Sequence, residues 1–458
     1  DEYFRRHDGQ AVTCEDFVAA MAAASGFDFT QFMRWYNQPG TPHVAVNGYF
    51  DAESKTYTLT CTQSNPRASD DLPYLIPLRV ALFTAEGALI AGADRLLQLS
   101  ARTQSFVFSN IDSEPTPSLL RDFSAPIVLD FAYTPEQLTL LLAHESDPFN
   151  AWEAGQRLAS TLILDAAAAI ADGREPAWPA RFVDACRHLL ETQAERGAAF
   201  VAEVLTLPGE STLAEMLDIV GPDALHAARN SLRRHLAEQL EAAFFSLYSR
   251  LTVDVPYTPS SEQAGRRALR NVCLAYLLEL GTEAVHQLAY SQFKQADNMT
   301  DQFAALAALA NVNAPVCPQR EAALAEFYDQ WRDEALVVDK WLLAQSTSRR
   351  PETLATVKAL TEHPAFDAGN PNKIYALIRS FGGNLVRFNA ADGSGYAFMA
   401  DRILLLHDKN PQVASRLARC FDRWKKFDTG RQSHARMALE RIRDHEGFSR
   451  DVLEVISH

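Results

Sequence analysis

Histidines next to glutamates are the residues with the clearest potential for chemistry. A helix with the pattern His-Glu-x-x-His places two imidazoles and a carboxylate on one face, where they can hold zinc and activate water. The chain has two His-Glu pairs, His144–Glu145 and His445–Glu446. The fifth position of the pattern is Pro148 in the first and Ser449 in the second, not histidine. Neither pair therefore forms such a site, and we expect no metal site in this chain.

Four other motifs favour structural roles. No Gly-x-Ser-x-Gly nucleophile elbow occurs. Residues 392–395 (DGSG) lack the preceding strand and the following lysine of a phosphate loop, and they indicate a turn that starts a helix. Residues 298–300 (NMT) match a glycosylation sequon but also fit a helix start. The His/Glu pairs at 188/191 and 235/238 are typical of a solvated helix face. The residues themselves thus predict no catalytic group.

The bulk composition limits partners and location. The chain has 458 residues, which suggests two or three domains, and its net charge of -15 disfavours nucleic acid and anionic membranes as partners. The longest apolar stretch, residues 158–171, is interrupted by Asp165 and is shorter than the roughly 20 residues of a membrane span. No signal peptide is visible and the sequence lacks an initiator Met, which indicates a processed protein or a fragment.

The cysteines indicate a reducing compartment. The six cysteines are Cys14, Cys61, Cys186, Cys273, Cys317 and Cys420, and no two are close in sequence, so no Cys-x-x-Cys motif exists. Four of them lie in apolar strand or helix patterns: Cys61, Cys186, Cys273 and Cys420. Buried free thiols are typical of cytoplasmic proteins, which is the location we expect. Long-range disulfides remain an alternative.

Hydrophobic periodicity predicts a mainly α protein with a small all-β domain. Residues 1–38 read as helix, with a capping box at Thr13 and Asp16 and an aromatic face from Phe29 to Tyr36. Residues 43–133 change to a two-residue period, with about seven short strands, which predicts an antiparallel β-sandwich of immunoglobulin-like type. From Thr134 onward the pattern is helical throughout, which fits stacked helix pairs in an armadillo/HEAT-like α-solenoid. On this evidence the chain is a binding or covering module.

Several segments together are similar to a known family. They are DEYFRRHDGQAVTCEDFVAAM and FMRWYNQPGTP near the start, then FNAWEAGQRLA (149–159), QADNMTDQFAALAAL (295–309), VVDKWLLAQS (337–346), NPNKIYALIRSF (370–381), ADGSGYAF (391–398) and NPQVASRL (410–417). In this order they resemble the C-terminal portion of bacterial aminopeptidase N, the alanyl aminopeptidase family of gluzincin zinc peptidases. The resemblance covers essentially the whole chain.

The resemblance implies a division into three parts. Residues 1–40 would be the last helices of a thermolysin-like catalytic domain, residues 41–134 the β-sandwich, and residues 135–458 the helical domain. The zinc ligands, the segment that binds the substrate amine and the transition-state tyrosine would all lie upstream, with the N-terminal and catalytic domains as partners. The resemblance therefore implies a chain that is not catalytic alone, in a parent enzyme that removes N-terminal residues from short peptides.

The same resemblance suggests where a peptide binds. In the family the helical domain closes an internal cavity, and Arg416 and Gln412 match positions that meet the far side of a bound peptide. A second cavity arginine of some relatives falls where this chain has Lys373 and Tyr375. The planar fork of an arginine suits a peptide carbonyl or C-terminal carboxylate. Periodicity alone leaves Arg416 the alternative of a solvated helix face.

One rival function belongs to another class. A stand-alone α-solenoid scaffold would bind a protein partner on its concave face and would not belong to an enzyme. The aromatic face of residues 17–36 separates the two, because it would be packed in a complete scaffold and would be adhesive or disordered if a neighbouring domain is missing.

Overall fold

The structure is a computed structural model that describes residues 1–253, 255–314 and 316–445. The chain divides into two compact units, residues 1–158 and residues 159 onward, which are described in turn. Glu446 and Ser449 of the second His-Glu motif lie outside the described residues. Among the described residues, no helix is both long and apolar enough to cross a membrane. All six cysteines are free thiols.

The first unit opens with three short helices, α1 (Glu2–His7), α2 (Cys14–Ser25) and α3 (Arg34–Asn37). The Thr13–Asp16 capping box at the start of α2 is confirmed. The prediction of helix throughout residues 1–38 is wrong for residues 8–13 and for residues 26–33. Gly26 adopts a left-handed conformation (φ 71°) that ends α2, and a turn at Asp28 follows.

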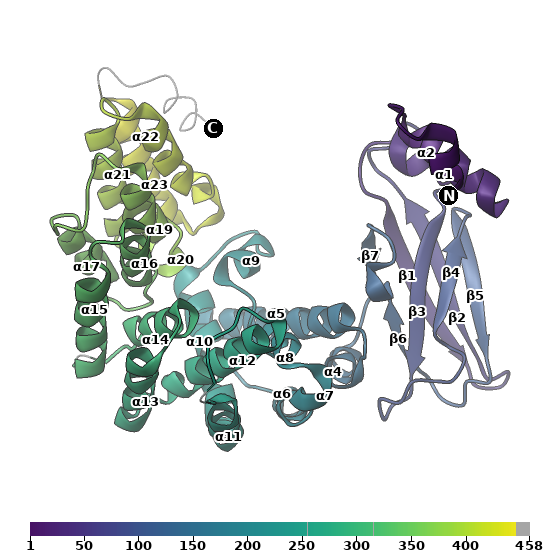
Figure 1. Cartoon of the computed structure of the whole chain (residues 1–458), viewed down its shortest axis with the longest axis horizontal. Coiled ribbons are helices and arrows are strands. Elements are labelled where there is room, and N and C mark those ends of the chain that lie inside the picture. The colour runs from purple at the N-terminus through teal and green to yellow at the C-terminus, as the bar shows by residue number, and fades with distance from the viewer. Residues whose placement is uncertain (254, 315, 446–458) are drawn as a thin grey trace. The chain divides into compact units, whose positions relative to one another are not determined.

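Residues 43–130 form the predicted sandwich of two sheets (Figure 1). One sheet has the order β5-β2-β1-β7 and the other β4-β3-β6. Their bounds are β1 (His43–Asp51), β2 (Thr56–Ser64), β3 (Ile76–Phe83), β4 (Arg95–Leu99), β5 (Thr103–Ser109), β6 (Thr116–Leu119) and β7 (Val128–Asp130). All pairs are antiparallel except β1 with β7.

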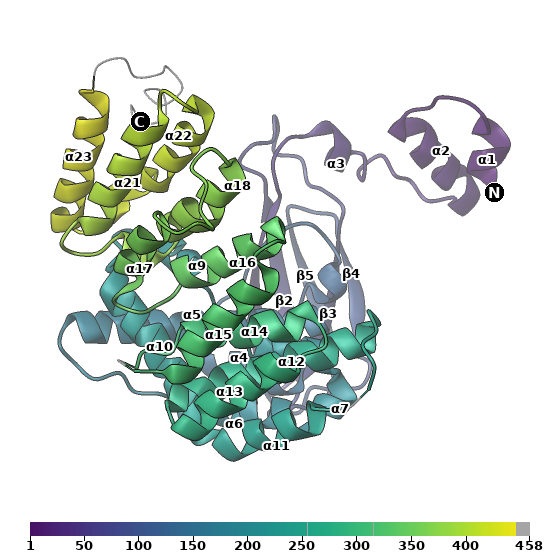
Figure 2. The ribbon, with the colours of Figure 1, turned by 60° about the vertical axis from the view of Figure 1, so that its left-hand side comes forward.

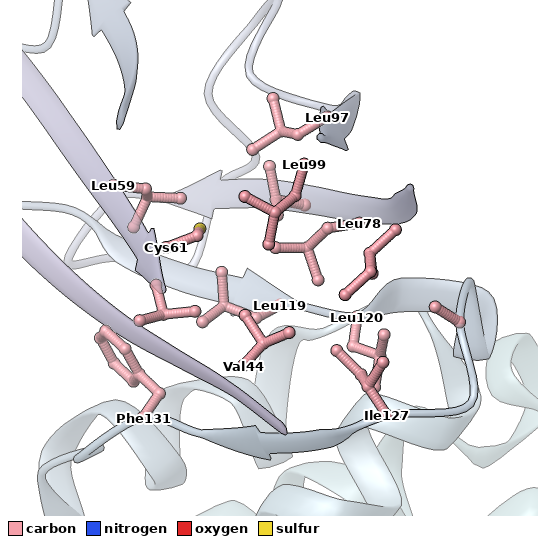
Figure 3. Packing of buried hydrophobic residues seen from close by; sticks show 14 of the residues in the cluster. Val44, Leu59, Cys61, Leu78, Leu97, Leu99, Leu119, Leu120, Ile127 and Phe131 are labelled. Carbon is pink, nitrogen blue, oxygen red and sulfur yellow. The ribbon is translucent and has the colours of Figure 1, made fainter. Parts of the chain in front are cut away.

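The two-residue period places one face of each strand in the core. Tyr57, Leu59 and Cys61 of β2 are buried, and Cys61 lies opposite Val46 of β1. Figure 3 shows Leu59 and Cys61 of β2 in the same cluster as Leu78, Leu99 and other apolar side chains from the two sheets. Burial of these side chains is the main stabilising contribution to this unit.

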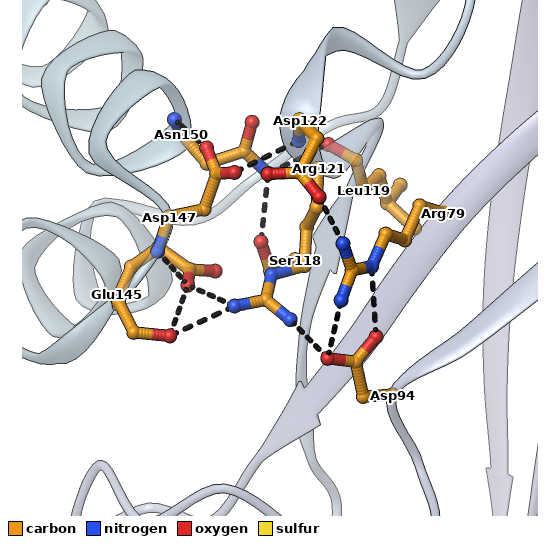
Figure 4. A network of polar contacts seen from close by, with 10 residues as sticks. Arg79, Asp94, Ser118, Leu119, Arg121, Asp122, Glu145, Asp147 and Asn150 are labelled. Atoms are coloured by element: carbon orange, nitrogen blue, oxygen red, sulfur yellow. Dashed lines mark hydrogen bonds and ion pairs between the residues drawn. The ribbon is translucent and has the colours of Figure 1, made fainter.

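A polar network joins the sandwich to the first helices of the chain's helical part, α4 (Pro135–His144) and α5 (Pro148–Ala171) (Figure 4). Arg121, in the turn η1 (Arg121–Phe123) after β6, is buried and donates to Asp94 (2.7 Å) and to Glu145 (3.0 Å). Asp147 accepts from the backbone N–H of Asp122 (2.8 Å). The network fixes the turn against the start of α5.

The second unit is helical, and its bounds are α6 (Ala180–Glu191), α7 (Gln193–Arg196), α8 (Ala198–Val204), α9 (Glu210–Glu215), α10 (Pro222–Gln239), α11 (Glu241–Leu251), α12 (Ser261–Leu277), η2 (Leu278–Leu280), α13 (Glu283–Gln295), α14 (Met299–Ala310), α15 (Pro318–Trp331) and α16 (Ala335–Ser346). The later elements are α17 (Thr353–Leu360), α18 (Pro371–Ile374), η3 (Tyr375–Arg379), α19 (Ser380–Gly382), α20 (Leu385–Phe388), α21 (Ser394–Leu406), α22 (Pro411–Ala418), η4 (Arg419–Phe421), η5 (Trp424–Lys426) and α23 (Thr429–Arg443).

These helices stack in pairs, as predicted. Helices α10, α12, α14 and α16 follow one another in one layer, and α13 and α15 pack together in a second layer (Figure 2). One apolar stripe is fully buried and consists of Leu232, Leu236, Leu240 and Phe244. The helix is interrupted within this stripe at Leu240, between α10 and α11. Asn298 caps α14 through its side chain, which explains the NMT motif.

Candidate functional site

Helix α22 carries Arg416, and its start is built from local signals. The Asn410 side chain accepts from the backbone N–H of Val413 (3.1 Å), and Pro411 occupies the first helical position. Val413 and Leu417 are buried in the core of the unit, while Arg416 is exposed on another face of the helix. The helix therefore anchors through its apolar face and presents Arg416 outward.

Arg416 lines a cavity of about 1010 Å³, which we name the Tyr375 cavity. Its walls come from α16, η3, α19, α20, α22 and η4. Arg416 Nη1 donates to the Tyr375 hydroxyl (2.9 Å), and its guanidinium carbon lies 5.7 Å from the centre of the Tyr375 ring. The Arg379 guanidinium lies 5.9 Å from the same ring. Two cations thus contact one aromatic ring in this cavity.

A π-helical turn places Tyr375 and Arg379 at the cavity. The segment Tyr375–Arg379 is wound as a π-helix, and the Ser380 hydroxyl donates to the carbonyl of Tyr375 (2.9 Å). The widened turn changes the phase of the side chains relative to an α-helix. Single π turns often occur at functional sites, which agrees with both ends of this segment reaching the cavity.

Positive charge predominates on the cavity wall. The lining cations are Lys340, Arg379, Arg416, Arg419 and Arg423, and the lining carboxylates are Asp339 and Asp422. Within the described part of the chain, no carboxylate forms an ion pair with Arg379, Arg416 or Arg419. These three guanidinium groups are exposed and can receive an anionic or carbonyl group.

The other two predicted residues do not line the cavity. Lys373 is buried, donates to the carbonyl of Ala335 (2.7 Å) and forms an ion pair with Asp339 (2.8 Å). Gln412 is exposed on α22 outside the lining residues. The structure therefore brings Arg416 and Tyr375 together, gives Lys373 a supporting position behind Asp339, and leaves Gln412 apart.

Sequence reasoning missed three cavity arginines. Arg419 follows Arg416 by three residues and Arg379 follows Tyr375 by four, spacings that place side chains on neighbouring parts of one helix face. Those spacings were the available signal. Arg423 gave no such signal, because it lies in the turn after η4 and pairs with Glu215 from a distant part of the sequence.

The cavity lacks an activated nucleophile. Burial raises the pKa of the Cys420 thiol, which also lines the cavity, to about 11, so the thiol is protonated at neutral pH. Across the described ranges, no three histidine, cysteine, aspartate or glutamate side chains lie together as a metal site would need. The geometry of the cavity fits recognition of a ligand.

The fold and the cavity define a chain with an immunoglobulin-like sandwich followed by a helical repeat domain. Two family models match these parts. A domain of unknown function with an Ig-like fold (DUF3458) matches residues 40–132, and a domain of unknown function with ARM repeats (DUF3458_C) matches residues 135–458. The chain belongs to the family that these two domains define.

The similar proteins are bacterial aminopeptidases. The chain is 39% identical to Aminopeptidase N of Escherichia coli and 38% identical to Aminopeptidase N of Caulobacter vibrioides, over 99% and 100% of its own length and 53% and 52% of theirs. A crystal structure of Legionella pneumophila aminopeptidase A in complex with aspartic acid matches 99% of the chain, with a TM-score of 0.80 and 32% identity. The chain spans about half the length of these relatives and corresponds to their C-terminal part.

Proposed function

We propose that this chain is the C-terminal region of a zinc-dependent aminopeptidase that removes N-terminal residues, such as alanine, from short peptides. Its role is to close the peptide cavity, with the Tyr375 cavity receiving the far end of the peptide. The observation that carries the proposal is the contact of Arg416 with Tyr375, beside Arg379 and Arg419, for which no described residue provides an ion pair.

A guanidinium group suits this role for a physical reason. Its planar fork donates two parallel hydrogen bonds to a carboxylate, and the Tyr375 contact holds the Arg416 side chain in one direction. Arg379 and Arg419 add positive charge to the same wall. A peptide with a free C-terminal carboxylate would gain more from this wall than the same peptide with a neutral end.

The bond-breaking step is proposed to lie upstream of this chain. The described residues lack a cluster of metal ligands, so they do not fit a zinc site and no metal-dependent step is assigned to them. Zinc would be bound by the upstream catalytic domain, which the relatives' greater length makes room for. We also propose a cytoplasmic location, supported by the six free thiols.

Exposed apolar side chains support an upstream partner domain. Phe4 is 66% exposed, Phe17 44% and Tyr36 55%, all within the first 37 residues. Large exposed aromatic side chains are typical of interfaces. We propose that residues 1–40 are the last helices of the catalytic domain of the same protein and that these side chains pack against the rest of that domain.

The test compares peptide ends in the protein extended through its upstream half. Arg416→Ala should raise KM for a free-acid alanyl tripeptide about tenfold, the effect of losing one charged hydrogen bond, with little change for the C-terminal amide. Arg174→Ala, an exposed arginine 65% accessible at its side chain, is the control. Equal KM values for wild type and Arg416→Ala across free-acid peptides of several lengths would refute the cavity role.

A second measurement tests where catalysis lies. The 458-residue chain alone, with zinc added, should bind no stoichiometric zinc and should not hydrolyse an alanyl chromogenic amide. Turnover with bound zinc would contradict the assignment of catalysis to the upstream part.

A further inference from the structure

The helical unit contains a second cavity of about 850 Å³, which we name the Arg349 cavity. Its walls come from α10, α12 and α14, which lie side by side (Figure 2), with His286 from α13 and two arginines from beyond α16. It shares no lining residue with the Tyr375 cavity. Nothing in the proposed peptidase role uses it.

Positive charge exceeds negative charge on its wall. Arg233, Arg234, Arg349 and Arg387 line the cavity, and Glu279 is the carboxylate among the lining residues. Glu279 Oε1 accepts a hydrogen bond from Arg349 Nη2 (2.8 Å) and forms an ion pair with Arg233 Nε (3.2 Å). One carboxylate therefore serves two half-buried guanidinium groups, which leaves excess positive charge in a partly desolvated site.

Neutral carbonyls accept the remaining hydrogen bonds of this group. Arg233 donates to the carbonyl of Ala275 (2.9 Å), and Arg387 Nε donates to the carbonyl of Arg349 (2.8 Å). These contacts satisfy donors without cancelling charge. Burial lowers the pKa of Arg233 and of Arg387, because their charged forms are held away from water.

A relay of hydrogen bonds fixes Arg349. Its Nη1 donates to Asn230 Oδ1 (2.6 Å), so the amide nitrogen of Asn230 faces His226 Nε2 (2.9 Å). His226 Nε2 must then accept, and His226 Nδ1 carries the proton that it donates to Glu210 (2.7 Å). Arg349 thus stands in a preset direction before any ligand arrives, which reduces the entropy lost on binding.

His286 supplies an independent sign of a ligand. This residue is 5% exposed and lines the cavity. Within residues 1–253, 255–314 and 316–445, its Nε2 has no hydrogen-bond partner. A buried polar atom without a hydrogen-bond partner costs free energy. In the tautomer with its proton on Nε2, this nitrogen would donate a hydrogen bond to a ligand oxygen in the cavity.

We propose that the Arg349 cavity binds a small oxyanion with more than one negative charge, either inorganic phosphate or a dicarboxylate. Arg233 and Arg349 provide the charge partners, and His286 donates through Nε2. An apolar ligand would leave the excess positive charge of the guanidinium groups without a counter-charge, and a cation would be repelled by them. The site is independent of the peptide-binding proposal.

Isothermal titration of the 458-residue chain at pH 7 in low chloride tests the site, with inorganic phosphate and malonate as separate probes. We expect saturable binding of at least one probe. Arg349→Gln should weaken it about tenfold or more, because it removes a charged fork. His286→Leu should weaken it severalfold without costing the fold a hydrogen bond. The exposed control Arg174→Gln should leave binding unchanged.

The outcomes separate the alternatives. Binding of phosphate alone or of malonate alone identifies the class of anion. Loss of binding in Arg416→Gln with full binding in Arg349→Gln would place the anion in the Tyr375 cavity and overturn the proposal. Absence of saturable binding by both probes would also overturn it. If circular dichroism shows that Arg349→Gln is unfolded, His286→Leu decides, and unchanged affinity in that variant refutes the site.

Discussion

The buried ion pair of Arg121 with Glu145 allows a sharp prediction about the joint between the sandwich and the first helices. The Arg121 side chain is 7% exposed and that of Glu145 0%. Arg121→Met keeps much of the side-chain volume and removes the charge, so the buried Glu145 loses its ion pair with Arg121. Breaking a buried pair by removing one partner costs about 3–5 kcal/mol. Methionine cannot replace the hydrogen bonds to Asp94 and Ser146 either.

Hydrogen exchange of the backbone amides of β3 and β6 measures this cost locally. A loss of about 3 kcal/mol corresponds to roughly a hundredfold faster exchange of amides that open with the whole unit. The matched control is Lys55→Met, because Lys55 pairs with Asp112 at side-chain exposures of 60% and 83%. Its exchange rates should stay within about threefold of wild type. If Arg121→Met stays within the same range, the network is not a stabilising clamp and the reasoning is refuted.

Two further predictions concern packing and acid stability. Gly382→Ala would bring a Cβ to 2.4 Å from Cys420 Sγ and should lower the free energy of unfolding by about 1–3 kcal/mol, measured by thermal melting. The control is Gly383→Ala, which should melt as wild type does because the nearest atom to its added Cβ would be 3.4 Å away. The hydrogen bond from Arg79 lowers the pKa of Asp94 in the folded protein, so Asp94 binds a proton more readily in the unfolded chain, and the free energy of unfolding decreases as the pH drops below about 4. Asp94→Asn should reduce this pH dependence in acid titrations followed by circular dichroism. An unchanged slope would exclude Asp94 as a cause.

The fold was predictable because its signals are local. The alternation of Tyr57, Leu59 and Cys61 needs only a strand with one buried face, and the structure buries all three. Helix caps at Thr13 and Asn298 likewise depend on a few neighbouring residues. The error at residues 26–33 arose because one local signal was overridden by another. An aromatic spacing of three and four residues fits a helix, but Gly26 had already ended it.

The candidate site was less predictable because it depends on contacts between distant segments. Arg416 and Tyr375 are 41 residues apart, and their contact follows from how α22 packs beside the π-helical turn. The sequence gives no signal for the π turn, because a single turn is too short to produce a hydrophobic period of its own. Lys373 shows the converse. The family resemblance suggested a ligand contact for this residue, yet within the fold Lys373 forms an ion pair with Asp339.

The arginines of this chain differ more in whether a carboxylate pairs with them than in how exposed they are. Arg423 reaches the Tyr375 cavity but has Glu215 as a partner, so an incoming carboxylate would have to compete with a fixed one. Arg416 has a neutral hydroxyl as its partner, which orients the guanidinium group without cancelling its charge. In the Arg349 cavity the same distinction holds, because Glu279 is divided between Arg233 and Arg349. A guanidinium group that is held in place but not neutralised retains most of its attraction for an anion, and this condition selects both cavities from the charged surface of an otherwise acidic chain.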